Sequence, residues 1–112
     1  MSVPSDFVEY ILDLLQPIPH IQTARMFGGV LLKVEGKQLG VLFEGVMYLK
    51  VIDPVLQERY QEEGSTQFTY TRKDKKRSVI IKNWWTVPEY ALDNGDELVR
   101  LAEEVLAQEA LD

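Results

Sequence analysis

The stretch VLLKVEGKQLGVLFEGVMYLKV, residues 30–51, decides the fold of this 112-residue chain. It contains three runs of strand-forming residues, which are separated by the turn signals Glu35-Gly36-Lys37 and Glu44-Gly45. Short connections that contain glycine join neighbouring antiparallel strands. The stretch therefore predicts a three-stranded meander, with strands at 30–34, 39–43 and 46–51.

The second and third of these strands are apolar at both alternate sets of positions. A sheet that has one face in water alternates apolar with polar residues instead. We therefore expect the second face of this sheet to be covered as well, either by a helix or by another subunit.

Helices and two further strands flank the meander. Ser5 precedes apolar residues at helical spacing, which predicts a helix near 5–16. Asp53-Pro54 begins a second helix that ends near Gly64. Strands are expected at 68–71 and 78–85, and Asp93 or Asn94 begins a last helix with apolar positions at Leu98, Leu101, Ala102, Val105 and Leu106.

The predicted order is α-β-β-β-α-β-β-α in a single domain, residues 1–112. Short connections within each run of strands imply an antiparallel five-stranded sheet with helices packed on it. The predicted fold class is therefore α+β, in a two-layer α/β arrangement.

Composition excludes several kinds of site. The chain has no cysteine and one histidine, His20, so disulfides, thiolate catalysis and zinc sites built from cysteine or several histidines are excluded. The net charge of −6 argues against nucleic-acid binding over the whole surface. No signal peptide and no uncharged apolar run of about 20 residues is present, so we expect a cytoplasmic protein without membrane contact.

Charge is divided between two neighbouring segments. Residues 72–88 carry six bases and one acid, whereas residues 89–112 carry eight acids and one base. Lysine and arginine side chains on a hairpin can bind phosphates, and an exposed indole beside them can stack on a nucleic-acid base. The candidates for nucleic-acid or partner contact are therefore Arg72, Lys73, Lys75, Lys76, Arg77, Lys82 and Trp84.

A structural interpretation of this segment is the alternative. Charged hairpin tips protect edge strands from pairing with other chains. Trp84 and Trp85 point to opposite faces if the strand continues through them, and both then belong to the core.

The other candidate sites favour structural roles. Gly28-Gly29 lacks the pattern of a phosphate loop and indicates a bulge or a close backbone approach at the start of a strand. The acidic residues 93–97 lack calcium-loop spacing and are better explained as a helix cap. Since nucleophile, acid and base candidates do not cluster, we predict no enzyme, no cofactor and no metal.

Arg25-Met26-Phe27-Gly28-Gly29 resembles the signature of the TfoX/Sxy amino-terminal domain family. The resemblance continues in family order through 45–51, 68–70 and 85–89, and it covers residues 10–108. The residues of this sequence that carry the family motif are Arg25, Met26, Phe27, Gly28, Gly29, Tyr48, Leu49, Lys50, Trp85 and Pro88.

The resemblance implies a fold like that of type III secretion chaperones, in a bacterial regulator. The regulators that name the family assist a global transcription activator in competence for DNA uptake, and they carry a carboxy-terminal helical domain that we do not expect in this chain. The expected function is a non-enzymatic regulatory or protein-interaction module, linked to transcription or competence, with a protein partner or as a homodimer. The alternative is a weak nucleic-acid-binding module that uses the basic hairpin and Trp84.

Overall fold

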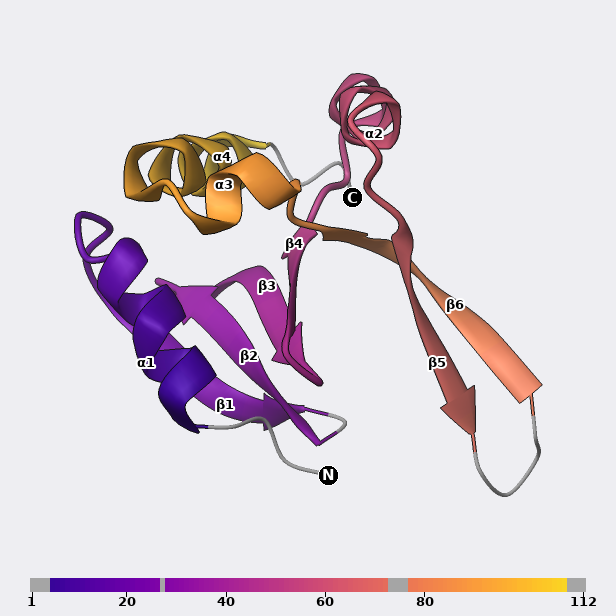
Figure 1. Ribbon diagram of the computed structural model, residues 1–112, viewed down its shortest axis with the longest axis horizontal. Coiled ribbons are helices and arrows are strands. Elements are labelled where there is room, and N and C mark those ends of the chain that lie inside the picture. The colour runs from indigo at the N-terminus through magenta and orange to yellow at the C-terminus, as the bar shows by residue number, and fades with distance from the viewer. Residues whose placement is uncertain (1–4, 27, 73–76, 109–112) are drawn as a thin grey trace.

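A computed structural model describes residues 5–26, 28–72 and 77–108, and all of their side chains except those of residues 5, 26, 70–72 and 77–82. The described residues form four helices and six strands. Their order is α1 (Ser5–Leu14), β1 (Ile21–Met26), β2 (Gly29–Val34), β3 (Lys37–Phe43), β4 (Val46–Lys50), α2 (Pro54–Glu62), β5 (Gln67–Arg72), β6 (Arg77–Thr86), α3 (Glu89–Leu92) and α4 (Gly95–Ala107), as shown in Figure 1.

The strands form one antiparallel sheet in the order β1-β2-β3-β4-β6-β5. The predicted α+β class and antiparallel sheet are confirmed, but the predicted count of five strands is wrong because β1 adds a sixth. Residues 22–25 of β1 are all exposed. No alternation of apolar and polar residues therefore marks this strand in the sequence. The short helix α3 was not expected either.

Three helices, α1, α3 and α4, lie on the same side of the sheet (Figure 1). They bury the main core against the inward side chains of β2, β3 and β4. Asn94 caps α4, and its side-chain oxygen accepts hydrogen bonds from the amides of Asp96 and Glu97. This confirms Asn94 as the start of the last helix. Of the apolar positions predicted there, Leu98, Leu101, Ala102 and Val105 are buried.

The opposite face of the sheet carries a second, smaller cluster. Leu31, Val41, Phe68 and Trp84 are buried in it. The ring of Phe68 on β5 lies 4.7 Å from the ring of Tyr48 on β4 and 5.2 Å from that of Phe43 on β3. Because β5 is not adjacent to β3 or β4 in the sheet, these contacts require the sheet to curl. Phe68 and Trp84 therefore cover the second face of the sheet, which we expected a helix or a second subunit to cover.

The two tryptophans separate as the strand pattern predicted. Trp85 belongs to the main core and Trp84 to the second cluster. Both side chains are buried, at 7% and 5% exposure respectively.

Positive φ angles confirm both predicted turns of the meander. Glu35 and Gly36 have φ of 50° and 85°, and Glu44 and Gly45 have φ of 50° and 76°. Two-residue hairpins favour a turn type whose twist matches that of the flanking strands. This turn type requires positive φ at both central residues. The short connections were therefore readable from the sequence.

Gly29 and Gly40 allow neighbouring strands to approach closely. A Cβ atom at Gly29 would collide with the carbonyl oxygen of Leu42, and one at Gly40 with that of Tyr48. The close backbone approach predicted for Gly28-Gly29 is confirmed at Gly29.

β5 and β6 continue beyond the body of the sheet as a two-stranded ribbon (Figure 1). β4 pairs with β6 only where Tyr48–Lys50 lies beside Trp84–Thr86. Just before this contact, Asn83 has a φ of 75°, and the β5–β6 register shifts next to Gln67. The ribbon leads to residues 73–76, which lie outside the described residues.

Gly40→Ala tests the close approach of β3 to β4. The added methyl group meets backbone that cannot move without breaking the strand pairing. We expect the free energy of unfolding to fall by about 1–3 kcal/mol, measured by urea denaturation.

Gly95→Ala is the matched control, because its Cβ would lie 3.5 Å from the Leu14 side chain, an ordinary van der Waals distance. Its unfolding free energy should change by less than about 0.5 kcal/mol. Equal stability of the two variants would contradict the steric account.

Candidate functional site

Gln108 joins three segments of the chain where α4 ends. Its side-chain oxygen accepts hydrogen bonds from the backbone amides of Ile52 and Asp53, at 2.7 and 2.9 Å. Its side-chain amide donates to the carbonyl oxygens of Lys50 and Val105, both at 2.9 Å. Gln108 therefore holds the connection from β4 to α2 against the end of α4.

The start of α2 presents an apolar side chain to solvent. Asp53 caps the helix, because its carboxylate accepts a hydrogen bond from the Val55 amide at 2.9 Å. Pro54 occupies the first helical position, where its missing N–H costs no hydrogen bond. Val55 is 76% exposed. Tyr60 is fully buried, so Val55 and Tyr60 lie on different sides of α2.

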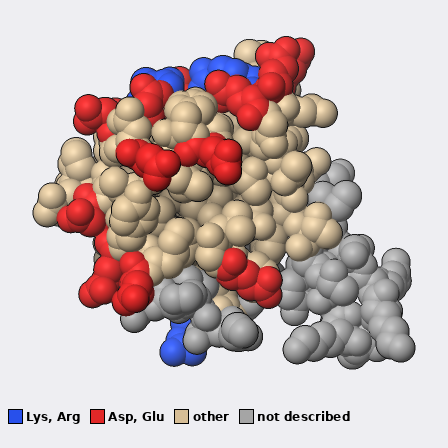
Figure 2. Space-filling view, in the orientation of Figure 1, with Lys and Arg blue, Asp and Glu red and all other residues tan. Residues whose placement is uncertain are grey.

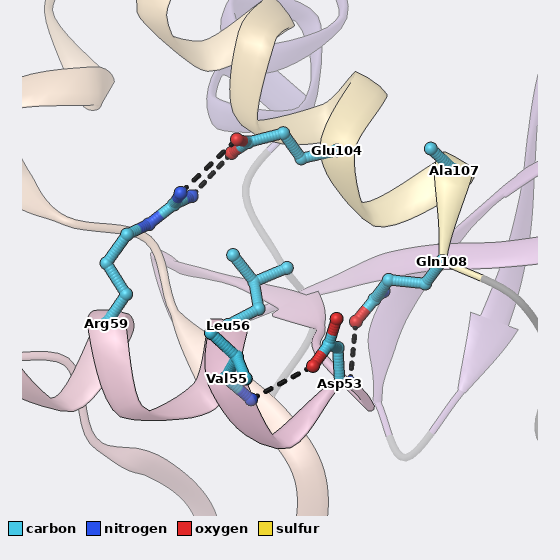
Figure 3. A pocket seen from close by; sticks show the side chains of 7 residues that line it. All are labelled: Asp53, Val55, Leu56, Arg59, Glu104, Ala107 and Gln108. Carbon is cyan, nitrogen blue, oxygen red and sulfur yellow. Dashed lines mark hydrogen bonds and ion pairs between the residues drawn. The ribbon is translucent and has the colours of Figure 1, made fainter.

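Figure 3 shows the groove between α2 and α4, with a volume of about 410 Å³. Its apolar lining comes from Val55, Leu56 and Ala107. Arg59 on α2 reaches Glu104 on α4 through two hydrogen bonds, at 2.5 and 3.3 Å. This ion pair joins the two helices on one side of the groove. The lining is completed by Asp53 and Gln108.

The hydrogen bonds that the Arg59 guanidinium donates to Glu104 raise the pKa of Arg59 above its ordinary value. Glu104 also lies 3.7 Å from Arg100, which is itself paired with Glu97 at 2.5 Å. These side chains are partly exposed, so each ion pair contributes little stability by itself. The Arg59–Glu104 pair joins α2 to α4, whereas the two pairs of Arg100 lie within α4. Figure 2 shows basic and acidic side chains next to each other along the top of the molecule, where α4 and α2 lie in Figure 1.

A second hollow, of about 840 Å³, adjoins the groove, and Ala107 and Gln108 line both. Ile52 and Leu106 supply apolar surface there, and Lys37 and Lys50 supply two cations. Lys37 donates to the Leu106 carbonyl at 3.4 Å, and Lys50 donates to the Gln38 side chain at 2.9 Å. Groove and hollow form one continuous surface, which we call the α2–α4 groove.

This arrangement is suited to binding. The described charged side chains of the groove lining already have intramolecular partners: Asp53 caps α2, and Arg59 pairs with Glu104. Within the described ranges, no group of three or more histidine, cysteine, aspartate or glutamate residues could hold a metal ion. No helix among the described residues is long and apolar enough to cross a membrane.

The site residues predicted from charge fall elsewhere. Lys73, Lys75 and Lys76 lie outside the described residues, and the structure describes no side chain for Arg72, Arg77 and Lys82, which lie on β5 and β6. Trp84 is buried in the second cluster, and its ring lies 5.8 Å from the Lys50 ammonium group. The indole is therefore not exposed for stacking on a base.

Some of the predicted motif residues are core residues, and others lie at the surface. Leu49 and Trp85 are buried in the main core, Tyr48 packs in the second cluster, and Pro88 precedes α3. Gly28 and Gly29 connect β1 to β2, Arg25 is exposed on β1, and Lys50 lines the second hollow. The side chain of Met26 and all of Phe27 lie outside the described residues.

No sequence pattern marks Val55 or Gln108 as a functional residue. The sequence Asp53-Pro54 predicted where α2 starts, but the exposure of the first turn of α2 depends on how the helix packs. Three of the four hydrogen bonds of Gln108 reach residues more than 50 positions away in sequence, and no local pattern signals them.

Fold and groove together define a two-layer α+β domain with a groove between α2 and α4. The family model for the TfoX N-terminal domain matches residues 13–109, and the chain belongs to this family. This confirms the resemblance read from the sequence. It is a family of regulatory domains and not a known enzyme family. No curated protein matches the sequence.

Gln108→Ala removes all four side-chain hydrogen bonds that hold the β4–α2 connection. We expect the free energy of unfolding to fall by about 1–3 kcal/mol, because partly buried backbone groups lose their partners. Hydrogen exchange at the amides of Ile52 and Asp53 should become faster. Gln61→Ala, at an exposed position of α2, is the control and should leave both measurements unchanged.

Proposed function

We propose that this chain is a non-enzymatic regulatory module that acts in the cytoplasm by binding a protein partner in transcription or competence control. Family membership supports the regulatory role. The α2–α4 groove is the surface we assign to the partner. Asp53, Arg59 and Glu104 in its lining already have partners within the chain, which suits recognition better than catalysis.

The observation that carries this proposal is the exposure of Val55. At 76% it is well above the other large hydrophobic side chains found exposed in the described residues, Tyr10, Tyr90 and Val46, which reach 45%, 44% and 38%. A single exposed hydrophobe is ordinary on a protein surface. Val55, however, adjoins the half-buried Leu56 in the wall of a groove. An apolar side chain from a partner could bury both.

The neighbouring charges fit a partner with acidic side chains. Lys37 and Lys50 line the adjoining hollow, and both ammonium groups can donate further hydrogen bonds. A partner that places an apolar side chain between α2 and α4, and acidic side chains next to these two lysines, would match the groove in shape and charge.

Capture of partners from the native host, before and after nuclease treatment, tests this function. Val55→Gln should weaken nuclease-resistant capture by about tenfold or more, because the apolar anchor is lost. Its stability should change by less than about 0.5 kcal/mol, since the side chain is already in water. Identification of the captured protein as a transcription or competence factor would support the regulatory role.

Val46→Gln is the matched control. Val46 is 38% exposed and shares with Tyr48 the opposite face of the sheet. Capture should survive this change. Loss of capture with Val46→Gln and not with Val55→Gln would move the partner site to the second face and contradict the assignment of the groove.

A second candidate function is nucleic-acid binding through the β5–β6 ribbon. The ribbon projects from the sheet, and the sequence places six bases and one acid within residues 72–88. A two-stranded ribbon fits the major groove of DNA. Because Trp84 is buried, the lysine and arginine side chains would have to make the contacts with DNA without the indole.

Fluorescence anisotropy with a labelled DNA duplex tests this second function. If the ribbon binds, affinity should fall steeply between about 50 and 200 mM salt. Replacing both Lys75 and Lys76 by Glu should abolish binding. The same replacements at Lys33 and Lys37, which change the net charge equally, should preserve most of it. No binding at low salt would exclude this function.

A further inference from the structure

β1 forms one edge of the sheet, because among the described residues it pairs only with β2. Its pairing runs without a register shift from Ile21–Val34 to Met26–Gly29. An edge strand presents a row of unpaired backbone N–H and C=O groups that another strand can pair with. The outer side of β1 is therefore a regular template for strand addition.

β1 has few of the devices that protect edge strands. Proteins guard an edge with charged side chains, above all lysine, and with proline, a bulge or a covering segment. The strand reads IQTARM, with Arg25 as its one charge and no proline, and its pairing with β2 contains no bulge. Gln22, Thr23, Ala24 and Arg25 are all exposed, so neither face of the strand is covered at these positions.

The other edge of the sheet is less regular. The register of β5 shifts between Gln67 and Phe68, and Phe68 turns into the second cluster with 1% exposure. The sequence that follows β5 is rich in lysine. The β5 edge is thus irregular and is followed by charged residues, whereas the β1 edge is regular and exposed to solvent.

We propose that β1 pairs antiparallel with β1 of a second copy of this chain, about a two-fold axis that passes beside Thr23. A two-fold axis between antiparallel strands must place one residue opposite itself. This follows because hydrogen-bonded and non-hydrogen-bonded pairs alternate along the ladder. With Thr23 on the axis, the pairing covers residues 21–25 in both copies. The proposal does not depend on partner binding in the α2–α4 groove.

The side chains of β1 favour an identical strand as the occupant. In this register Thr23 meets Thr23 of the partner subunit, and threonine pairs across strands are favourable. Gln22 lies opposite Ala24 and Arg25 opposite Ile21, so no like charges face each other. A foreign peptide added to an edge gains specificity from pockets for its alternate side chains. The small or flexible side chains at positions 22–25 offer little for such recognition.

Pairing through β1 leaves the α2–α4 groove free. α2 lies at the top of Figure 1, away from β1, and follows β4, which β2 and β3 separate from β1 in the sheet. The dimer would continue one sheet through both copies and present two grooves. A bivalent partner would then bind more tightly than one groove allows.

Sedimentation equilibrium with Thr23→Lys tests the dimer. Two lysine side chains would meet on the axis, so we expect the Kd of dimerisation to rise by about tenfold or more. Thr69→Lys is the matched control: the same change at an exposed threonine of the other edge strand, which should leave the Kd unchanged. A native chain that stays monomeric at about 1 mM, a concentration at which even weak complexes form, would overturn the proposal and leave β1 to a peptide from another protein.

Disulfide trapping tests the register and does not depend on the folding of the lysine variant. Because the chain contains no cysteine, Thr23→Cys introduces its only thiol. Residues opposite each other in antiparallel strands have Cα atoms about 4.5–5.5 Å apart, within the range that a disulfide can bridge. Thr23→Cys should form covalent dimers on mild oxidation, and Thr69→Cys should not. Equal cross-linking by the two variants would overturn the assignment of β1.

Discussion

The central sheet is apolar on both faces, and the arrangement of the remaining elements follows from the need to bury both. Burial of apolar surface is the main favourable contribution to folding. The main core takes α1, α3 and α4 on one side. The second cluster is closed by Phe68 and Trp84, which belong to the sheet itself. The sheet must curl to achieve this, and the shifted register near Gln67 and the positive φ of Asn83 lie where the ribbon departs.

The α2–α4 groove is a consequence of this topology. β4 is followed in sequence by β5 but lies beside β6 in the sheet, so the chain must cross β6 to reach the edge. α2 makes that crossing at the side of the sheet and is held to α4 by Gln108 and by the Arg59–Glu104 ion pair. The first turn of α2 consequently leaves Val55 in solvent.

The two edges of the sheet differ in regularity and exposure. Curling turns β5 into the second cluster and makes that edge irregular. β1 stays regular and uncovered at residues 22–25. An open sheet always has two edges, and only a closed barrel removes both. Association of two copies through β1 would leave each dimer with two β5 edges, which are the irregular ones.

The sequence by itself determined the features that depend on local chemistry. The turns that contain Gly36 and Gly45, the Asn94 cap and the separation of Trp84 from Trp85 all follow from residue type and strand period. The family motif was recognisable for the same reason. Tertiary structure decided the rest. Leu39 and Val41 are two positions apart, yet they enter opposite cores, because the β2–β3 register shifts at Leu39: Leu32 pairs with Gly40, and Lys33 pairs with Gln38. The existence of β1, the exposure of Val55 and three of the four hydrogen bonds of Gln108 likewise depend on contacts between distant segments, and no local pattern encodes such contacts.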